Sequence, residues 1–350
     1  MVRSYPMPAR YAVNALLIVL SGVLLMTLRA AGIINEYWNG ILIMVGINII
    51  LAASLNIPVG YLGQLPLGHA GFMAIGAYAS GIYLKTTPLA KLVRGNLTPE
   101  AIFYIVMGLL IAMLISGFVG FLIGILALRL RGDYLTIITL GFGEIIRVVL
   151  TNIDQTLGIT LTYGAAGLKR LPKFTSLLLI FICVVLCLFL IHVLLKSRHG
   201  RAILSIRENE IAAESVGIPT TYYKTYAFAF SAALAGLAGA LYAGYLGSLY
   251  PTSFTFMKSI EVLVIVVLGG MGSMLGSVLS ATLYTTLQEL LRGLESYRMV
   301  TFALLLILMM IFRPKGLLGD YDFSLSRWVE KLLARRKKTG KEEEHAESLS

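Results

Sequence analysis

The sequence predicts an all-α polytopic membrane protein with about ten transmembrane helices, some of them broken. Two features of the composition support this prediction: hydrophobic residues make up 57% of the chain and charged residues only 13%, against about 25% charged residues in soluble domains. The mean hydropathy is +0.83, and many apolar runs approach ~20 residues, the length of a helix that crosses a bilayer. A transmembrane β-barrel is excluded because its strands are shorter and alternate in hydropathy.

The apolar runs define the predicted spans in chain order. They cover residues 11–34, 38–57, 61–84, 101–130, 133–150, 174–195, 221–247, 258–274, 276–291 and 298–313. This even number of spans places both termini on one side of the membrane. The loops on that side, taken with the basic C-terminal tail, carry more Lys and Arg than the opposite loops, and such residues favour the cytoplasm. Both termini are therefore predicted to be cytoplasmic.

Residues 56–76 are apolar but contain too many helix breakers to form one continuous helix. The breakers are Pro58, Gly60, Gly63, Pro66 and Gly68. Proline removes a backbone donor, and irregular backbone at membrane depth is tolerated only against protein or a water-filled cavity. Because broken helices line substrate pathways in transporters, Gln64 and His69 are candidate pathway residues. The alternative is a tight turn near the membrane surface with a hydrogen-bonded histidine.

Glu144 and Arg147 lie three residues apart inside the predicted span 133–150. Ionisable groups within a span are costly and are functional candidates by default. Three-residue spacing places both side chains on one helix face, where each offsets the charge of the other. Two interpretations stay open, a structural ion pair and a gate or pathway site. Asn48, in the middle of its span, is expected to form a hydrogen bond across helices.

Charged residues interrupt the apolar pattern in the segment 196–219, between two long predicted spans. The segment has helix-forming composition and a stop at Gly217 and Pro219, which predicts one or two short helices just outside the bilayer. A lipid-resting helix favours Lys and Arg on its polar face, whereas acids and bases are mixed here. The mixture favours a docking site for a protein partner, with a solvated loop or an amphipathic helix resting on lipid headgroups as the alternative.

Small residues recur every four positions within the predicted span 221–247, at Ser231, Ala235, Gly239 and Ala243 and again at Ala232, Gly236, Ala240 and Gly244. This spacing lets helix backbones approach closely, which predicts a packing helix. The glycine-rich stretch 268–277 is predicted to be a tight turn or helix break at a packing contact. It lacks the Gly-Lys-Ser/Thr of a Walker A motif, which occurs nowhere in the chain.

Several function classes are excluded by the sequence. It contains no His-Glu-x-x-His, no Gly-x-Ser-x-Gly and no metal-spaced Cys/His cluster, so no catalytic or metal-binding residues are expected. Cys183 and Cys187, four apart in one span, are expected to be packing residues. The basic residues lie beside apolar spans, which indicates membrane orientation and lipid contact rather than nucleic-acid binding. Residues 320–350 are predicted to form a cytoplasmic interfacial helix followed by a disordered tail.

Five motifs in order resemble the LivM-type permease subunit of branched-chain amino acid ABC importers. They are Gly-Gln-Leu-Pro-Leu-Gly-His-Ala-Gly-Phe (63–72), Gly-Asp-Tyr-Leu-Thr-Ile-Ile-Thr-Leu-Gly-Phe-Gly-Glu-Ile-Ile-Arg (132–147), His-Gly-Arg-Ala-Ile-Leu-Ser-Ile-Arg-Glu-Asn-Glu-Ile-Ala-Ala-Glu-Ser-Val-Gly-Ile (199–218), Leu-Gly-Gly-Met-Gly-Ser (268–273) and Phe-Arg-Pro-Lys-Gly-Leu-Leu-Gly (312–319). The sequence departs from the family pattern at Pro66, Tyr163 and Ser277, where the family more often has Ser, Gly and Pro.

The resemblance implies a transmembrane permease domain over residues 1–319 in a prokaryotic plasma (inner) membrane. It implies that this domain forms the translocation pathway with a LivH-like second permease and receives substrate from an extracytoplasmic binding protein. Two cytoplasmic ABC ATPase subunits would use the ATP, and this chain would bind no cofactor. We call residues 196–219 the coupling segment, since 199–218 resembles the family's ATPase-contacting motif. Its implied contact residues are Arg207, Glu208, Glu210, Ala213 and Gly217.

The alternative function is a stand-alone channel or secondary transporter for a small polar solute such as urea. It would need no ATPase, and Glu144, His69 or Glu261 would serve ion coupling. Departures from the family pattern at Pro66 and Tyr163 leave the substrate open, because relatives of the family carry urea, amides or other amino acids.

Overall fold

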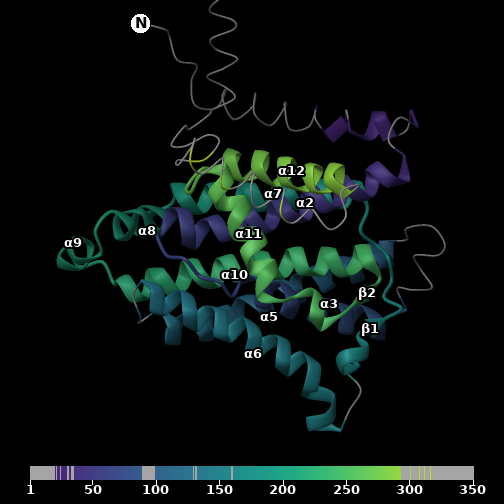
Figure 1. The fold of residues 1–350 in the computed structure, drawn as a ribbon, viewed down its shortest axis with the longest axis horizontal. Helices are drawn as coiled ribbons and strands as arrows, with labels where there is room; N and C mark the ends of the chain where they lie inside the picture. Colours follow the sequence, from purple (N-terminus) through teal and green to yellow (C-terminus); the bar gives the residue numbers. More distant parts are fainter. Residues whose placement is uncertain are drawn as a thin grey trace, which may run out of the picture. The chain divides into compact units, whose positions relative to one another are not determined.

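The computed structural model describes residues 35–88, 99–158 and 161–292, apart from Arg129 and Arg131, together with scattered positions before residue 33 and after residue 299. Two predicted spans, 11–34 and 298–313, lie mostly outside the described residues, and the predicted tail helix and disordered end (320–350) lie wholly outside them. Residues Glu36–Asp320 form one unit by their contacts. Figure 1 shows this unit as a bundle of helices with almost no strand.

The described helices fall into two groups, long elements and short connecting ones. The long helices are α2 (Glu36–Asn56), α3 (His69–Thr86), α5 (Pro99–Ala127), α6 (Asp133–Leu157), α7 (Leu177–Lys196), α10 (Thr220–Leu246), α11 (Phe256–Gly269) and α12 (Met274–Leu290). The short elements are η1 (Ile57–Tyr61), η2 (Gly164–Ala166), α8 (Arg198–Glu208), α9 (Glu210–Ser215) and η3 (Pro251–Ser253). Strand β1 (Leu168–Lys169) pairs antiparallel with β2 (Ser248–Leu249), Leu168 opposite Leu249.

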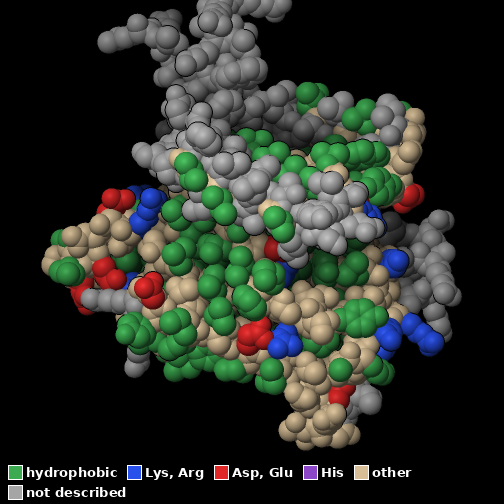
Figure 2. Space-filling model, in the orientation of Figure 1, with side chains coloured by type: hydrophobic (Ala, Val, Ile, Leu, Met, Phe, Trp, Pro, Cys, Tyr) green, Lys and Arg blue, Asp and Glu red, His purple; other side chains and the backbone are tan. Residues whose placement is uncertain are grey.

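Six of the described helical segments are long and apolar enough to cross a membrane. Every predicted span between residues 38 and 291 corresponds to one helix, although α3 and α12 are not among the six. The prediction was wrong about the start of α3, which begins at His69 rather than at 61, because the breakers before it prevent helix formation. Figure 2 shows most charged side chains at the two ends of the bundle, with an apolar band between them, as a bilayer requires.

Helix α10 lies at the centre of the bundle and contacts α3 and α5 almost backbone to backbone. A Cβ atom added to Gly239 would overlap the carbonyl oxygen of Met73 on α3, and one added to Gly236 would meet Ser116 on α5. The Ser116 hydroxyl also lies 3.0 Å from the Phe72 carbonyl and 2.7 Å from the Ala232 carbonyl. The predicted packing role of the small residues is therefore confirmed.

Helix α2 packs against α7, α10 and α12. Asn48 donates a hydrogen bond of 2.9 Å to Thr285 Oγ1 on α12, which confirms the predicted bond across helices. Cys183 and Cys187 are buried on α7 as free thiols, as expected of packing residues.

Candidate functional site

The predicted break after α2 is present and consists of two parts. Five residues, Ile57–Tyr61, continue α2 as a π-helical turn with Pro58 in its first turn, and residues 62–68 then form non-helical chain before α3 begins. A proline cannot donate in the α-helical ladder, and a wider turn absorbs the mismatch. Gly63 adopts a positive φ of 76°, and the backbone N–H of Gln64 donates a hydrogen bond of 2.8 Å to the Pro58 carbonyl.

The glycine-rich turn between α11 and α12 packs directly against this break. The Asn56 side chain accepts a hydrogen bond from Gly272 N (2.8 Å) and donates to Ser273 O (3.0 Å) and Ser277 Oγ (2.9 Å). A Cβ atom added to Gly60 would collide with the Gly272 backbone, so only glycine permits this approach. Two irregular segments more than 200 residues apart therefore form one structural unit, held together by the buried Asn56.

The two candidate pathway residues of the break, His69 and Gln64, differ in burial and in hydrogen bonding. His69 is buried at the start of α3 with Nε2 2.8 Å from Ser54 Oγ. Because that hydroxyl donates to the Leu51 carbonyl, the histidine donates to the serine through its Nε2–H. Gln64 is only half-buried, and among the described residues its Oε1 is shielded without a hydrogen-bond partner. Their assignment to the pathway stays a prediction.

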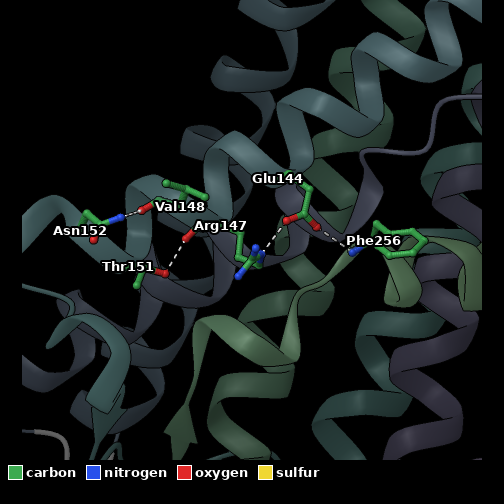
Figure 3. Close-up of polar contacts among 6 residues, drawn as sticks. All are labelled: Glu144, Arg147, Val148, Thr151, Asn152 and Phe256. Carbon is green, nitrogen blue, oxygen red and sulfur yellow. Dashed lines mark hydrogen bonds and ion pairs between the residues drawn. The ribbon is translucent and has the colours of Figure 1, made fainter.

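Glu144 and Arg147 form the ion pair that their spacing predicts, and Glu144 also contacts a second helix. Its Oε2 lies 2.7 Å from Arg147 Nε, while its Oε1 accepts a hydrogen bond of 3.0 Å from Phe256 N (Figure 3). Phe256 is the first residue of α11, and a carboxylate at a helix N-terminus is favourable. A narrow crevice beside Glu144 is lined by residues of α3, α6 and the 254–259 stretch. The pair thus stabilises the packing of α6 on α11; a gating role stays a prediction.

The coupling segment folds into two short helices, as predicted. Ser197 caps α8 by accepting from Gly200 N at 3.2 Å, and Asn209 caps α9 by accepting from Ala212 N at 3.0 Å. Asn209 itself has extended backbone, so it ends one helix and starts the next. Gly217, with φ of 84°, ends α9 as its left-handed position requires. In Figure 1, α9 projects from one end of the bundle.

The buried face of the coupling segment agrees only in part with the sequence pattern. Helical spacing allows Ala202, Ile206, Ala213 and Val216 to share one face, and Ile206 and Ala213 are buried (each 4% exposed), whereas Val216 is 75% exposed. The interruption at Asn209 changes the register, because periodicity counted along α8 does not continue into α9. Ile211 is also 72% exposed. The predicted contact residue Ala213 therefore packs inside the segment, and Ile211 and Val216 form its exposed apolar surface.

Glu210, a second predicted contact residue, forms an ion pair within the chain. Its Oε2 lies 2.7 Å from Nζ of Lys224 in the first turns of α10. The Lys224 side chain is only 3% exposed, and that of Glu210 is 25% exposed. A buried ammonium group needs a counter-ion, so Glu210 fixes α9 on α10. The remaining predicted contact residues Arg207, Glu208 and Gly217 are exposed.

An open polar hollow lies near the other end of the bundle and was not anticipated from the sequence. It has a volume of about 370 Å³ and is lined by Thr151, Asn152, Asp154, Gln155, Tyr163, Gly164 and Ala165. Asp154 accepts hydrogen bonds of 2.9 Å from the amides of Leu161 and Thr162 and thereby holds the loop after α6. Tyr163, one of the departures from the family pattern, has φ of 61° and lies under Lys85 Nζ, 3.8 Å from its ring centre.

Comparisons with known proteins agree with the resemblance. The sequence model of the family described as branched-chain amino acid transport system / permease component matches residues 37–313. The chain is 40% identical to the high-affinity branched-chain amino acid transport system permease protein LivM of Salmonella typhimurium over 79% of this chain and 68% of the relative. The Escherichia coli LivM is 39% identical over 78% and 68%. The autoinducer 2 import system permease protein LsrC of Salmonella typhimurium is 31% identical over 52% and 54%. No solved structure matches. The chain belongs to the family of permease components of branched-chain amino acid transport systems.

Proposed function

We propose that this chain is a membrane permease subunit of an ATP-driven importer and forms the translocation pathway with a LivH-like second permease. The observation that carries the proposal is the coupling segment, whose short helix α9 projects from the bundle of a chain that belongs to a permease family. ATP hydrolysis is assigned to two separate cytoplasmic ATPase subunits, since the sequence has no Walker A motif. The segment and both termini then lie in the cytoplasm of a prokaryotic cell.

The surface proposed to contact the ATPase is the exposed apolar pair Ile211 and Val216. Both large apolar side chains are exposed on an otherwise charged segment, where they are available to a protein partner. Glu208 and Gly217 are exposed next to this pair in the sequence and belong to the same surface. Glu210 and Ala213 hold α9 in place, because Glu210 pairs with Lys224 and Ala213 is buried.

Substitution of Ile211 tests the docking proposal without disturbing packing, because its side chain is exposed. Ile211→Asp should lower the amount of ATPase that co-purifies in mild detergent by about tenfold or more, as expected of a central interface residue. Leu290→Asp is the matched control: Leu290 is 70% exposed at the end of α12. This end of α12 lies beside the start of α2, since Tyr37 donates a hydrogen bond to the neighbouring Glu289. The coupling segment lies at the opposite end of α2, where α8 contacts η1. Equal recovery of the ATPase with Ile211→Asp and wild type would refute the docking surface.

The proposed substrates are branched-chain amino acids, which the names of the LivM relatives specify for those proteins. The LsrC relative is named for a different import system, so competition assays should include unrelated solutes. Uptake of radiolabelled leucine into cells should stop when ATP is depleted under a maintained ion gradient. Uptake that continues without ATP, and stops with an uncoupler, would favour a stand-alone secondary transporter instead. The proposed extracytoplasmic binding protein would deliver the substrate to the opposite membrane face.

A further inference from the structure

Arg207 in the last turn of α8 contacts both irregular membrane segments at once. A Cβ atom placed on Gly63 would lie 3.3 Å from Arg207 Cγ, and one placed on Gly272 would lie 3.1 Å from Arg207 Nη1. Gly63 belongs to the break after α2, and Gly272 belongs to the turn between α11 and α12. The aliphatic part of the side chain therefore packs on the first segment, and its guanidinium lies against the second.

The chemistry of this location suits a guanidinium group. Helix α8 ends at Glu208, the helical run of α2 and η1 ends at Tyr61, and α11 ends at Gly269. The last carbonyls of a helix lack partners within it and carry partial negative charge. The Gly60 carbonyl oxygen lies 3.3 Å from the position that a Cβ atom on Gly272 would occupy. Arginine offers five donors in a rigid plane and stays charged, so a guanidinium group suits a location close to several helix C-termini.

The two segments that Arg207 contacts are already joined to each other. Asn56 forms three hydrogen bonds to the 272–277 stretch, and the backbones of Gly60 and Gly272 touch. A displacement of one segment therefore displaces the other. Arg207 connects this joined unit to α8, the helix that precedes the proposed docking surface.

We propose that Arg207 is a positioning residue that transmits movement of the coupling segment to the joined breaks at 57–68 and 270–273. This role rests on the proposed function, and it differs from the direct ATPase contact that the sequence motif implies for Arg207. When the ATPase subunits displace α9, α8 moves with it, and the arginine moves both breaks together. The breaks then rearrange as one unit instead of two independent loops.

The experiment compares Arg207→Met with Arg198→Met in the full complex reconstituted in liposomes. Methionine keeps an apolar stem and removes the guanidinium, and Arg198 is an exposed arginine at the other end of α8. For Arg207→Met, substrate transported per ATP hydrolysed should fall about tenfold or more, while the ATPase subunits still co-purify. Arg198→Met should match wild type. Arg207→Lys, which keeps the charge, should recover part of the transport.

Other outcomes separate the two proposals. Loss of both transport and co-purified ATPase in Arg207→Met, with the melting temperature of the chain unchanged, would show direct docking and overturn the positioning role. Wild-type transport per ATP in Arg207→Met would overturn it as well. If Arg207→Met does not fold, Arg207→Lys decides: wild-type transport per ATP refutes a role for the planar guanidinium. Failure of the wild-type chain to co-purify any ATPase would instead refute the proposed function.

Discussion

Removal of the Glu210 carboxylate should destabilise the protein through the lysine that it neutralises. The Lys224 side chain is 3% exposed, and its Nζ lies 2.7 Å from the Glu210 carboxylate. Glu210→Ala removes this carboxylate and leaves the ammonium group buried. Breaking a fully buried ion pair costs about 3–5 kcal/mol. Because the Glu210 side chain is 25% exposed, water screens part of this interaction, and we expect a loss of about 2–3 kcal/mol.

Thermal unfolding of the purified chain in detergent measures this effect. A loss of this size should lower Tm by roughly 3–6 °C in Glu210→Ala. Lys224→Met should cost less, because Glu210 can turn toward water when its partner is absent. The double variant Glu210→Ala/Lys224→Met should recover most of the loss, which gives the coupling energy of the pair.

The matched control is Glu214→Ala, which removes an exposed carboxylate from the same short helix. If Glu210→Ala and Glu214→Ala have the same Tm, the proposed stabilising role of the ion pair is wrong. The double variant also separates folding from docking. A stable double variant that no longer binds the ATPase would restore the direct contact that the sequence motif implies for Glu210.

Three further substitutions test the packing of the irregular segments and of α10. Asn56→Ala leaves the Gly272 amide without its acceptor and should cost about 2–4 kcal/mol, visible as a lower Tm; an unchanged Tm would show that the two breaks do not depend on this side chain. Glu144→Ala removes both the ion pair and the acceptor for Phe256 N, whereas Glu144→Gln keeps an acceptor, so only the alanine variant should lose more than about 1 kcal/mol of stability, visible as a lower Tm. Gly239→Ala places a methyl group on a backbone carbonyl of α3 and should abolish recovery of folded protein by size-exclusion chromatography, while Gly141→Ala, with nothing within 4 Å of the added atom, should behave as wild type; folded Gly239→Ala would contradict the close packing.

Local sequence signals predicted the individual elements better than the contacts between them. The breakers in 56–76 and the glycines in 268–277 each indicate an interrupted helix, because proline and glycine act on their own turn. Their mutual contact depends on Asn56, an ordinary polar residue at the end of an apolar run, and no periodicity links positions so far apart.

The coupling segment shows the same limit at shorter range. Its charge and its stop signal at Gly217 predicted short helices outside the spans. The exposure of Val216 could not be predicted, since the change of register at Asn209 decides which face of α9 is buried. In the sequence, Glu210 likewise resembles a solvent-facing docking residue. Its ion pair with Lys224, fourteen positions later, is known only from the structure. The order of the family motifs identified the family correctly, because such motifs depend on sequence alone.

The backbone-level contacts of α10 also restrict how the protein can change shape. Because Gly236 and Gly239 bring the backbone of α10 against α5 and α3, these three helices have little room to slide past one another. They should therefore move as a rigid body during a transport cycle. Relative motion is easier at α6, of which only a small part is buried and which meets α11 through the carboxylate of Glu144. Spin labels on α3 and α10 should thus keep a constant distance in all states, while labels on α6 and α10 should not.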